Sequence, residues 1–331
     1  MIVIKSKALL LHKILVIIQM LTRRHLRIKV MQSLYSFLQN REGNLADEIN
    51  FFKKSYLNTF SLYLSLLAFL KSIHDHVVEQ TNLQKGLRST VLYNNSAKLV
   101  DNRVLKFIAH HPVLDKYIKK RKIKFWELDF DYVKSNFKLL MESEKFNDYV
   151  KIESPSLEED RSIISYFFKE IVAPSEDFYD YIEDKELTWI DDLPVVNTFL
   201  LKMLNKIDPQ NAGSLQFPEM NSAEEDPQFA IDLLEKVVVN NDTLQEEMAG
   251  RTANWDSERI AVLDAIMIKM AMAELLFFPS IPTKVTMNEY IEISKDYSTP
   301  KSNTFINGIL DKTIKDFDQS GRLNKSGRGL I

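Results

Sequence analysis

The sequence contains no cysteine and little glycine or proline. Its 331 residues include 8 Gly and 10 Pro, which is about a third and a little over half of ordinary usage. Without cysteine the chain can form neither a disulfide scaffold nor a Cys-type zinc site, and it has no thiol nucleophile. The absence of cysteine also suits a reducing compartment, so we expect a cytoplasmic protein.

Turn signals of the kind that join β-strands are nearly absent as well. The first proline is Pro112, and Asn307-Gly308 is the single Asn-Gly, Asp-Gly or Gly-Gly pair in the chain. Such pairs form the usual hairpin turns, so their scarcity excludes an all-β fold. With 45% hydrophobic and 27% charged residues, the composition predicts a globular all-α protein with long helices.

Positive charge is concentrated at the N-terminal end. Residues 1–41 contain eight Lys or Arg and no acid, a net charge of +8, so the other 290 residues carry -11 of the total of -3. A basic end on an acidic body is typical of a protein that binds a polyanion with one face. The alternative is a basic leader with no binding role.

The leader, residues 1–19, resembles a targeting segment only superficially. His12 and Lys13 split its apolar runs, which are shorter than the roughly 20 residues that a membrane span needs. It also lacks the small-residue cleavage site of a signal peptide. We therefore expect no membrane role. The leader is either an extra amphipathic helix or the result of a start assigned upstream of Met20.

Helical periodicity begins at Thr22, which is a predicted N-cap. The apolar positions of this first helix recur at spacings of four, four and three, namely at Leu26, Val30, Leu34 and Phe37. The next helical region, at about 45–79, is apolar on nearly every face and should be largely buried. The remaining predicted segments are helices at about 84–109, 113–121, 125–147 and 156–172, a surface loop at 208–227, and a disordered tail after Phe317.

The last third of the chain has clear helix boundaries. A helix that starts after Trp255, which we expect to be buried, must stop near Phe278 because Pro279 follows. Thr286 and Glu289 form a capping box that opens the next helix.

Thr299-Pro300 is a typical start for the final helix. Asn307-Gly308 lies inside that helix, where Gly costs about 1 kcal/mol. A residue of low helix propensity inside a helix indicates either close backbone packing or a surface that a ligand approaches.

Catalytic patterns are missing. The six histidines show no metal-ligand spacing, and the chain has no Gly-rich phosphate loop, no G-x-S-x-G elbow and no H-E-x-x-H motif. We therefore expect no catalytic residue, no metal and no cofactor, so the protein is not predicted to be an enzyme.

A basic row on the first helix is the best candidate for nucleic-acid binding. Arg24, Arg27, Met31 and Tyr35 follow one another at steps of three, four and four, with no acid nearby in the sequence. Guanidinium groups in a row can pair with successive phosphates, and the tyrosine ring can stack on an unpaired base. The alternatives are a half-buried aromatic at Tyr35 and a merely solvated arginine face.

Several blocks of sequence resemble the NusB family of transcription antitermination factors. RRHLRIKVMQSLY at 23–35 is similar to the family's N-terminal signature. Three C-terminal blocks follow the family in order and spacing, namely WDSERI at 255–260, AELLFFPSIPTKVTMNEYIEISKDYS at 273–298 and SNTFINGILDK at 302–312. The resemblance covers about 20–40 and 228–317, so the long middle is either an insertion or an elaborated helical half.

The resemblance implies a helical bundle of two helical subdomains, here with a large helical insertion. The expected domains are a leader at 1–19, an N-terminal helical subdomain at 20–83, a helical insertion and acidic loop at 84–227, a C-terminal NusB-like helical subdomain at 228–317, and a disordered tail at 318–331.

The resemblance also implies a function in transcription. NusB pairs with NusE, the small-subunit ribosomal protein, and both bind single-stranded boxA RNA in ribosomal RNA leader transcripts within the RNA polymerase antitermination complex. Two alternatives are a helical scaffold that binds proteins, and an accessory domain from a ribosomal RNA methyltransferase lineage without its catalytic domain. No Gly-rich cofactor loop follows the matched blocks, which disfavours the second alternative.

Matched position by position, the family's RNA-facing residues fall on both ends of this chain. His25 stands where another Arg is common, which removes one charge. Phe305 could equally be a core residue. The RNA-binding residues implied by the resemblance are Arg23, Arg24, Arg27, Tyr35, Lys295, Ser302, Phe305 and Asn307.

Overall fold

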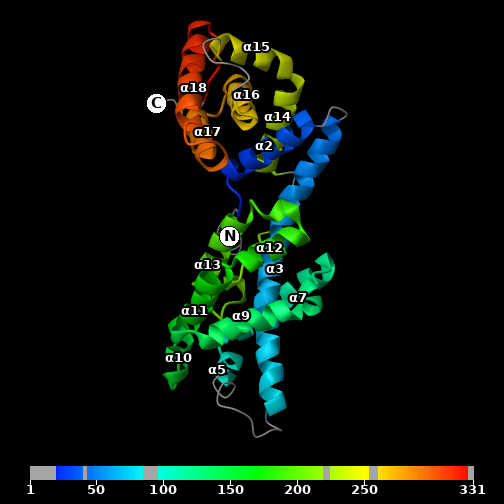
Figure 1. Ribbon diagram of the computed structural model, residues 1–331, viewed down its shortest axis with the longest axis vertical. Coiled ribbons are helices and arrows are strands. Elements are labelled where there is room, and N and C mark those ends of the chain that lie inside the picture. The colour runs from blue at the N-terminus through cyan, green and yellow to red at the C-terminus, as the bar shows by residue number, and fades with distance from the viewer. Residues whose placement is uncertain (1–19, 40–42, 85–95, 219–223, 253–259, 327–331) are drawn as a thin grey trace, which may run out of the picture. The chain divides into compact units, whose positions relative to one another are not determined.

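The computed structural model describes residues 20–39, 43–84, 96–218, 224–252 and 260–326. Within these ranges every regular element is helical and there is no strand, which confirms the all-α class (Figure 1). The leader at 1–19 and Trp255 lie outside the described residues, so the predictions for them stay predictions.

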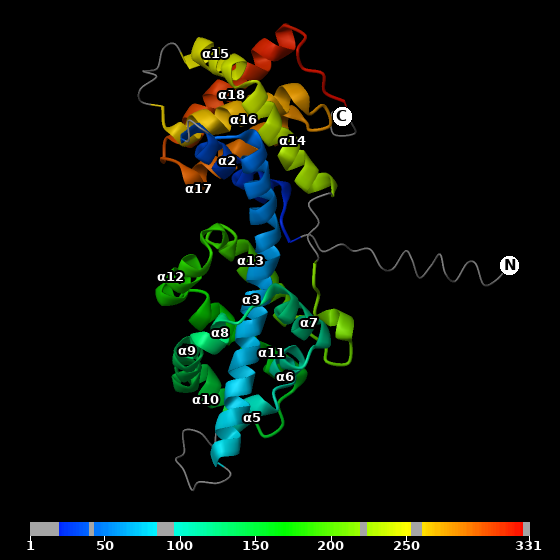
Figure 2. The same cartoon turned by 90° about the vertical axis from the view of Figure 1, so that its right-hand side faces the viewer.

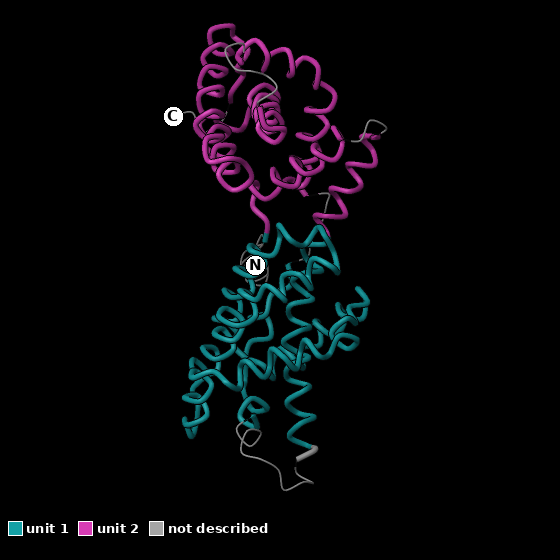
Figure 3. The backbone as a smooth tube through the Cα atoms, viewed as in Figure 1, with its two compact units in different colours: residues 1–20, 58–220 teal, residues 21–57, 221–331 magenta. Residues whose placement is uncertain are grey.

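The chain forms two compact units (Figure 3). Unit 1 comprises 1–20 and 58–220, and unit 2 comprises 21–57 and 221–331. One long helix, α3 (Leu45–Gln84), contributes its first part to unit 2 and the rest to unit 1. Unit 2 thus joins two segments that are far apart in the sequence.

Unit 2 is built around α16 (Figure 1, Figure 2). This helix contacts five others because it is apolar on most of its faces, and every residue from Ile266 to Leu275 is buried. The helices of unit 2, besides the start of α3, are α2 (Arg23–Gln39), α14 (Glu225–Val239), α15 (Asn241–Thr252), α16 (Val262–Phe277), α17 (Thr283–Tyr297) and α18 (Ser302–Gln319).

The first helix, α2, begins directly after Thr22, as its sequence predicts. Leu26, Val30 and Leu34 are buried as expected, whereas Phe37 is partly exposed. The buried face is wider than a single stripe, because α14, α16 and α17 all contact α2.

Helix boundaries in the last third match the sequence in part. α16 ends at Phe277 before Pro279, which confirms the proline argument. The capping box at Thr286 is wrong, since α17 already begins at Thr283. Thr286 is instead buried, and its Oγ1 donates to Glu274 at 2.8 Å.

The predicted start of the final helix is also wrong. α18 begins at Ser302 rather than at Thr299-Pro300. The hydroxyls of Ser298 and Ser302 donate to the buried carboxylate of Asp264 at 2.6 and 2.7 Å. This tertiary anchor fixes the start of the helix in place of a local cap.

The prediction of a disordered tail after Phe317 is wrong for its described part. α18 continues to Gln319, and Gly321 turns the chain with φ of 68°. Lys325 Nζ then donates to the carbonyls of Glu274 and Phe278 at 3.1 and 3.0 Å. The cation satisfies carbonyl groups at the C-terminal end of α16, where the helix dipole also favours positive charge.

Unit 1 packs short helices around the second part of α3. Its core is rich in aromatic rings, and Phe69 of α3 contacts Trp126, Phe167 and Phe178 at centroid distances of 4.9, 6.2 and 5.6 Å. The elements are α5 (Ala97–Val100), α6 (Arg103–Ala109), α7 (Pro112–Arg121), α8 (Phe125–Leu128), α9 (Phe130–Glu142), α10 (Glu144–Lys151), α11 (Leu157–Tyr166), the π-helical turn η1 (Phe167–Val172), α12 (Glu176–Lys185), the 3₁₀ turns η2 (Leu187–Trp189) and η3 (Ala212–Ser214), and α13 (Leu193–Leu204).

These helices are shorter than the periodicity predicts. The predicted helix at 125–147 is broken at Asp129 and again at Ser143, whose side chain caps α10. The predicted loop at 208–227 ends earlier than expected, because α14 already begins at Glu225. Caps and breaks within an apolar pattern decide these boundaries.

Among the described residues, α3 is long and apolar enough to cross a membrane by length and composition alone. However, 72% of its most apolar 18-residue stretch is buried inside the protein. A core helix passes the same test, so the apolar character of α3 is accounted for by packing.

Candidate functional site

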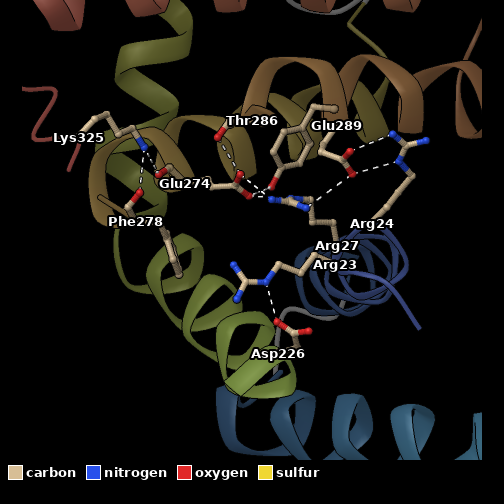
Figure 4. Close-up of polar contacts among 10 residues, drawn as sticks. Arg23, Arg24, Arg27, Asp226, Glu274, Phe278, Thr286, Glu289 and Lys325 are labelled. Atoms are coloured by element: carbon tan, nitrogen blue, oxygen red, sulfur yellow. Dashed lines mark hydrogen bonds and ion pairs between the residues drawn. The ribbon is translucent and has the colours of Figure 1, made fainter. Parts of the chain in front are cut away.

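The arginines predicted to bind RNA lie at the N-terminal part of α2 in unit 2, and the deepest of them is Arg27. Its side chain is 2% exposed. Nε and Nη2 donate to Oε2 and Oε1 of Glu274, both at 2.8 Å (Figure 4). Thr286 and Tyr290 of α17 donate to the same carboxylate at 2.8 and 3.2 Å. A buried bidentate ion pair with further hydrogen bonds therefore joins α2, α16 and α17.

The protonation states of this cluster follow from its burial and its partners. Burial opposes the charge of Arg27, but the hydrogen bonds and charge of Glu274 outweigh it and raise the guanidinium pKa. Burial and the neighbouring carboxylate raise the pKa of Tyr290 well above its usual range, so the phenol stays protonated and donates. Arg27 is thus a permanently charged part of the core.

Arg23 and Arg24 lie at the surface and are also paired (Figure 4). Arg24 donates from Nε and Nη2 to Glu289 at 3.0 and 2.9 Å, and Arg23 Nε donates to Asp226 at 2.7 Å. The hydrogen bond to Glu289 raises the pKa of Arg24. Its side chain remains 40% exposed.

These contacts correct the basic row predicted from the sequence. Arg27 and Met31 of that row are buried rather than facing solvent. No acid lies near the arginines in the sequence, yet Asp226, Glu274 and Glu289 reach them from the other end of the chain. Sequence reasoning missed these carboxylates. The one available signal was Glu274 within a largely apolar helix, because a buried charge requires a partner.

An open pocket of about 630 Å³ lies where α2 begins. Its wall combines three basic side chains of α2 and the imidazole of His25 with the apolar turn before α17, including Ile281 and Pro282. The backbone N–H of Thr22 donates to His25 Nδ1 at 3.1 Å, and the Thr22 hydroxyl lies 2.9 Å from the same atom. The imidazole thereby caps the first turn of α2.

The far end of α2 presents Tyr35, a residue that is 44% exposed. Leu38 of α2 and Phe51 of α3 are also exposed large hydrophobic residues. The Ser36 hydroxyl donates to Glu48 at 3.2 Å, which ties this end of α2 to the beginning of α3. Three exposed large hydrophobic residues of unit 2, Tyr35, Leu38 and Phe51, thus lie on the last part of α2 and the first part of α3.

The C-terminal candidates differ in their exposure to solvent. Lys295 is exposed and pairs with Glu292, and Asn307 is exposed on α18. Ser302 is buried and donates to Asp264, so its hydroxyl has a structural role. Phe305 is partly exposed.

Gly308 follows Asn307 on an exposed face of α18, and a Cβ there would have no neighbour within 4 Å. Close backbone packing is therefore not the reason for this glycine. Within the described ranges, no group of three or more His, Cys, Asp or Glu could hold a metal ion.

Comparison with known proteins places the similarity in the C-terminal part of the chain. The NusB family model matches residues 198–315. The transcription antitermination protein NusB of Salinibacter ruber is 43% identical over 111 residues, which are 33% of this chain and 69% of that protein. The protein of the same description from Geobacter sulfurreducens is 40% identical over 93 residues, 28% of this chain and 67% of that protein.

A third relative and one solved structure extend the comparison. NusB of Chloroherpeton thalassium is 41% identical over 103 residues, 31% of this chain and 49% of that protein. A structure of T. maritima NusB matches with a TM-score of 0.27 and 25% identity, over 42% of this chain and 85% of that chain. The identity and coverage of the Salinibacter protein settle the relationship: this chain belongs to the NusB family.

Proposed function

We propose that the protein is a cytoplasmic, RNA-binding transcription antitermination factor. It binds boxA-type RNA of ribosomal RNA leader transcripts together with NusE, within the RNA polymerase antitermination complex, and catalyses no reaction. The main support for the proposal is that the carboxylates that pair with the arginines of α2 belong to the segment that matches the NusB family. Glu274 and Glu289 lie inside the segment 198–315 that matches the family, and they hold Arg27 and Arg24 at the start of α2.

In this proposal the three arginines have different roles. Arg24 uses two of its five N–H donors on Glu289, so three remain for a phosphate. Arg23 borders the same pocket. Arg27 is buried and acts as a positioning residue, since its ion pair with Glu274 fixes the helix turn that carries Arg23 and Arg24.

The other candidates differ in how well they can reach an RNA. Tyr35, Lys295 and Asn307 are exposed and suit base stacking, phosphate pairing and hydrogen bonding. Phe305 is accessible in part, whereas Ser302 acts through its bond to Asp264. Leu38 and Phe51 are exposed apolar residues that suit a protein partner, and we assign them to NusE.

A gel-retardation titration of boxA RNA, with and without NusE, tests the proposal. We expect retardation that is strengthened by NusE and weaker for a scrambled RNA. Arg24→Ala should lower the slope of log affinity against log salt by about 0.7, the value for one phosphate contact on a single strand. Arg322→Ala is the matched control, because that arginine is also ion-paired and 38% exposed in unit 2.

Tyr35 provides a second test at the opposite end of α2. Tyr35→Ala should cost roughly 1 to 3 kcal/mol of RNA binding if a base stacks on the ring, whereas Tyr35→Phe should be mild. Loss of NusE binding with unaltered RNA affinity would move Tyr35 to the protein interface.

A helical protein-interaction scaffold is the second candidate, and the ion pairs favour it. Arg23, Arg24 and Arg27 are each matched by carboxylates, so the start of α2 carries less net positive charge than its sequence indicates. If the protein binds NusE but retards neither boxA RNA nor its scrambled control, the scaffold is correct.

A further inference from the structure

Unit 1 carries a dense group of cations at the end of α7. The nine residues 116–124 contain six Lys or Arg and no acid. All six side chains belong to exposed residues, and we call them the α7 cluster: Lys116, Lys119, Lys120, Arg121, Lys122 and Lys124.

The charge of the α7 cluster is not neutralised by the described part of the chain. None of its five lysines forms an ion pair there, and two of the acids that flank it are engaged elsewhere. Asp115 pairs with Lys71 at 3.5 Å, and Asp129 pairs with Lys185 at 2.7 Å. Glu127 is the remaining flanking acid. This differs from the arginines of α2, each of which has a carboxylate partner.

The α7 cluster is attached to a well-packed part of unit 1. Leu114 before the cluster and Ile123 within it are buried, and the guanidinium of Arg121 lies 5.9 Å from the ring centroid of buried Phe60. The charged side chains therefore project from a packed helix end. Interaction with the helix dipole explains cations in the last turn, but not Lys116 before it or Lys124 after it.

Lys122 supplies a second, independent observation. It adopts the left-handed conformation at the C-cap of α7, with φ of 55° and ψ of 40°, and is the one described non-glycine residue with positive φ. Glycine is the usual residue at such a helix end, because a Cβ is strained there. The sequence thus keeps a cation at a position where glycine would be more stable.

We propose that the α7 cluster is a second RNA-binding surface, which holds the phosphate backbone of RNA that flanks the element bound by unit 2. Lysines on flexible stems suit sequence-independent contacts with phosphates. On a helix, positions three or four apart such as Lys116, Lys119 and Lys120 are neighbours, so they can pair with phosphates of one strand. A membrane surface fits less well, since α7 turns Leu114 to the core and Val113 is its single exposed large hydrophobic residue.

The inference rests on the proposed function only in assigning both surfaces to one RNA. The test uses the full chain and two single-stranded RNAs, a short boxA RNA of about 12 nucleotides and the same element extended to about 40. The main variant is the triple Lys119→Ser, Lys120→Ser, Lys124→Ser. Its matched control neutralises three other exposed lysines of unit 1 that are paired with neighbouring acids, Lys134, Lys138 and Lys151.

We expect the triple variant to bind the long RNA at least about tenfold more weakly at 0.1 M salt, with a salt slope lower by about 2, since each lost phosphate contact removes about 0.7. Binding of the short RNA and the melting temperature should not change, and the control should match the wild type. Unchanged affinity and slope for the long RNA overturn the inference. An equal loss in the control overturns it too, because general charge would then be the cause.

Lys122→Gly tests the inference without risk to the fold. We expect a melting temperature at least equal to the wild type and a salt slope on the long RNA lower by about 0.7. Higher stability with unaltered RNA affinity contradicts the role given to Lys122.

Two further measurements distinguish this inference from the proposed boxA function and from membrane binding. If the wild type binds the long RNA through the α7 cluster but does not prefer boxA over a scrambled sequence, the proposed function fails and the inference stands. Flotation with vesicles of phosphatidylserine and phosphatidylcholine probes the membrane reading. Vesicle binding that the triple variant loses, with no loss of RNA affinity, assigns the cluster to lipid and overturns the inference.

Discussion

At the scale of single residues, Arg27 shows how tertiary contacts change the meaning of a sequence motif. By position it belongs to a basic row, and by burial it belongs to the core. Its guanidinium also lies over the rings of Phe229 and Tyr290, with centroid distances of 5.1 and 5.9 Å. The residue therefore stabilises unit 2 through packing as well as through its ion pair.

Arg27→Ala should lower the free energy of unfolding by about 3 to 5 kcal/mol, because it leaves the carboxylate of Glu274 buried without its cation. Urea denaturation measures this directly. Arg24→Ala, at an exposed ion pair, should cost at most about 1 kcal/mol. The sequence alone suggests that folding is unaffected by either change. Equal, small losses for both variants would show that the buried pair is not required.

The acid stability of unit 2 should depend on Glu247. Burial acts against its charge, but hydrogen bonds from Arg322 and Arg251 lower its pKa below the usual 4.5. The unfolded state then binds the proton more readily, so the stabilisation is present above pH 4.5 and is lost as the pH falls through the folded pKa.

Urea midpoints measured from pH 7 down to pH 3 test this expectation. Glu247→Gln should be less stable at pH 7 and should show a smaller loss of stability below pH 4.5 than the wild type. Parallel curves for the two proteins would mean that Glu247 contributes nothing to the acid transition.

At the scale of elements, α18 retains one local conflict. Gly308 lies in the interior of this helix, at an exposed position with open space where its Cβ would be. Neither a turn nor a close packing contact in unit 2 requires glycine there. Asn307-Gly308 therefore remains a candidate for a surface that a ligand approaches.

Gly308→Ala should raise the free energy of unfolding by about 1 kcal/mol, because alanine has the higher helix propensity and meets no neighbour. Thermal melting measures the gain. Weaker boxA binding by the stabilised variant would indicate that RNA approaches the backbone at this position. A loss of stability would contradict the open space around Gly308.

At the scale of the whole molecule, the chain has two units with separate interiors. The aromatic core of unit 1 draws on 58–220, and the core of unit 2 is centred on α16. The proposed boxA site lies on unit 2 and the α7 cluster on unit 1. Stability and RNA binding of the two units should therefore be separable.

Phe69→Ala should destabilise unit 1 by about 3 to 5 kcal/mol, since Phe69 is fully buried against three aromatic rings. Urea unfolding followed by tryptophan fluorescence should show an earlier transition, while boxA binding persists at the same urea concentration. Leu310→Ala, fully buried in unit 2, should do the reverse. One transition shifted equally by both variants would show that the units unfold together.

The sequence by itself determined the all-α class, the start of α2 after Thr22 and the end of α16 before Pro279. These features depend on periodicity, caps and prolines within a few residues of one another. The resemblance of short blocks was likewise enough to indicate the NusB family.

Tertiary structure alone decided which basic residues are accessible. Arg27 pairs with a carboxylate 247 positions away. Thr286 bonds to Glu274 instead of capping a helix, and Ser302, where α18 begins in place of Thr299-Pro300, bonds to Asp264. No local pattern encodes such pairings, because a buried charge selects its partner by distance in space. The lysines of the α7 cluster form no ion pair with a described carboxylate. They are therefore a more exposed cationic surface than the arginines of α2.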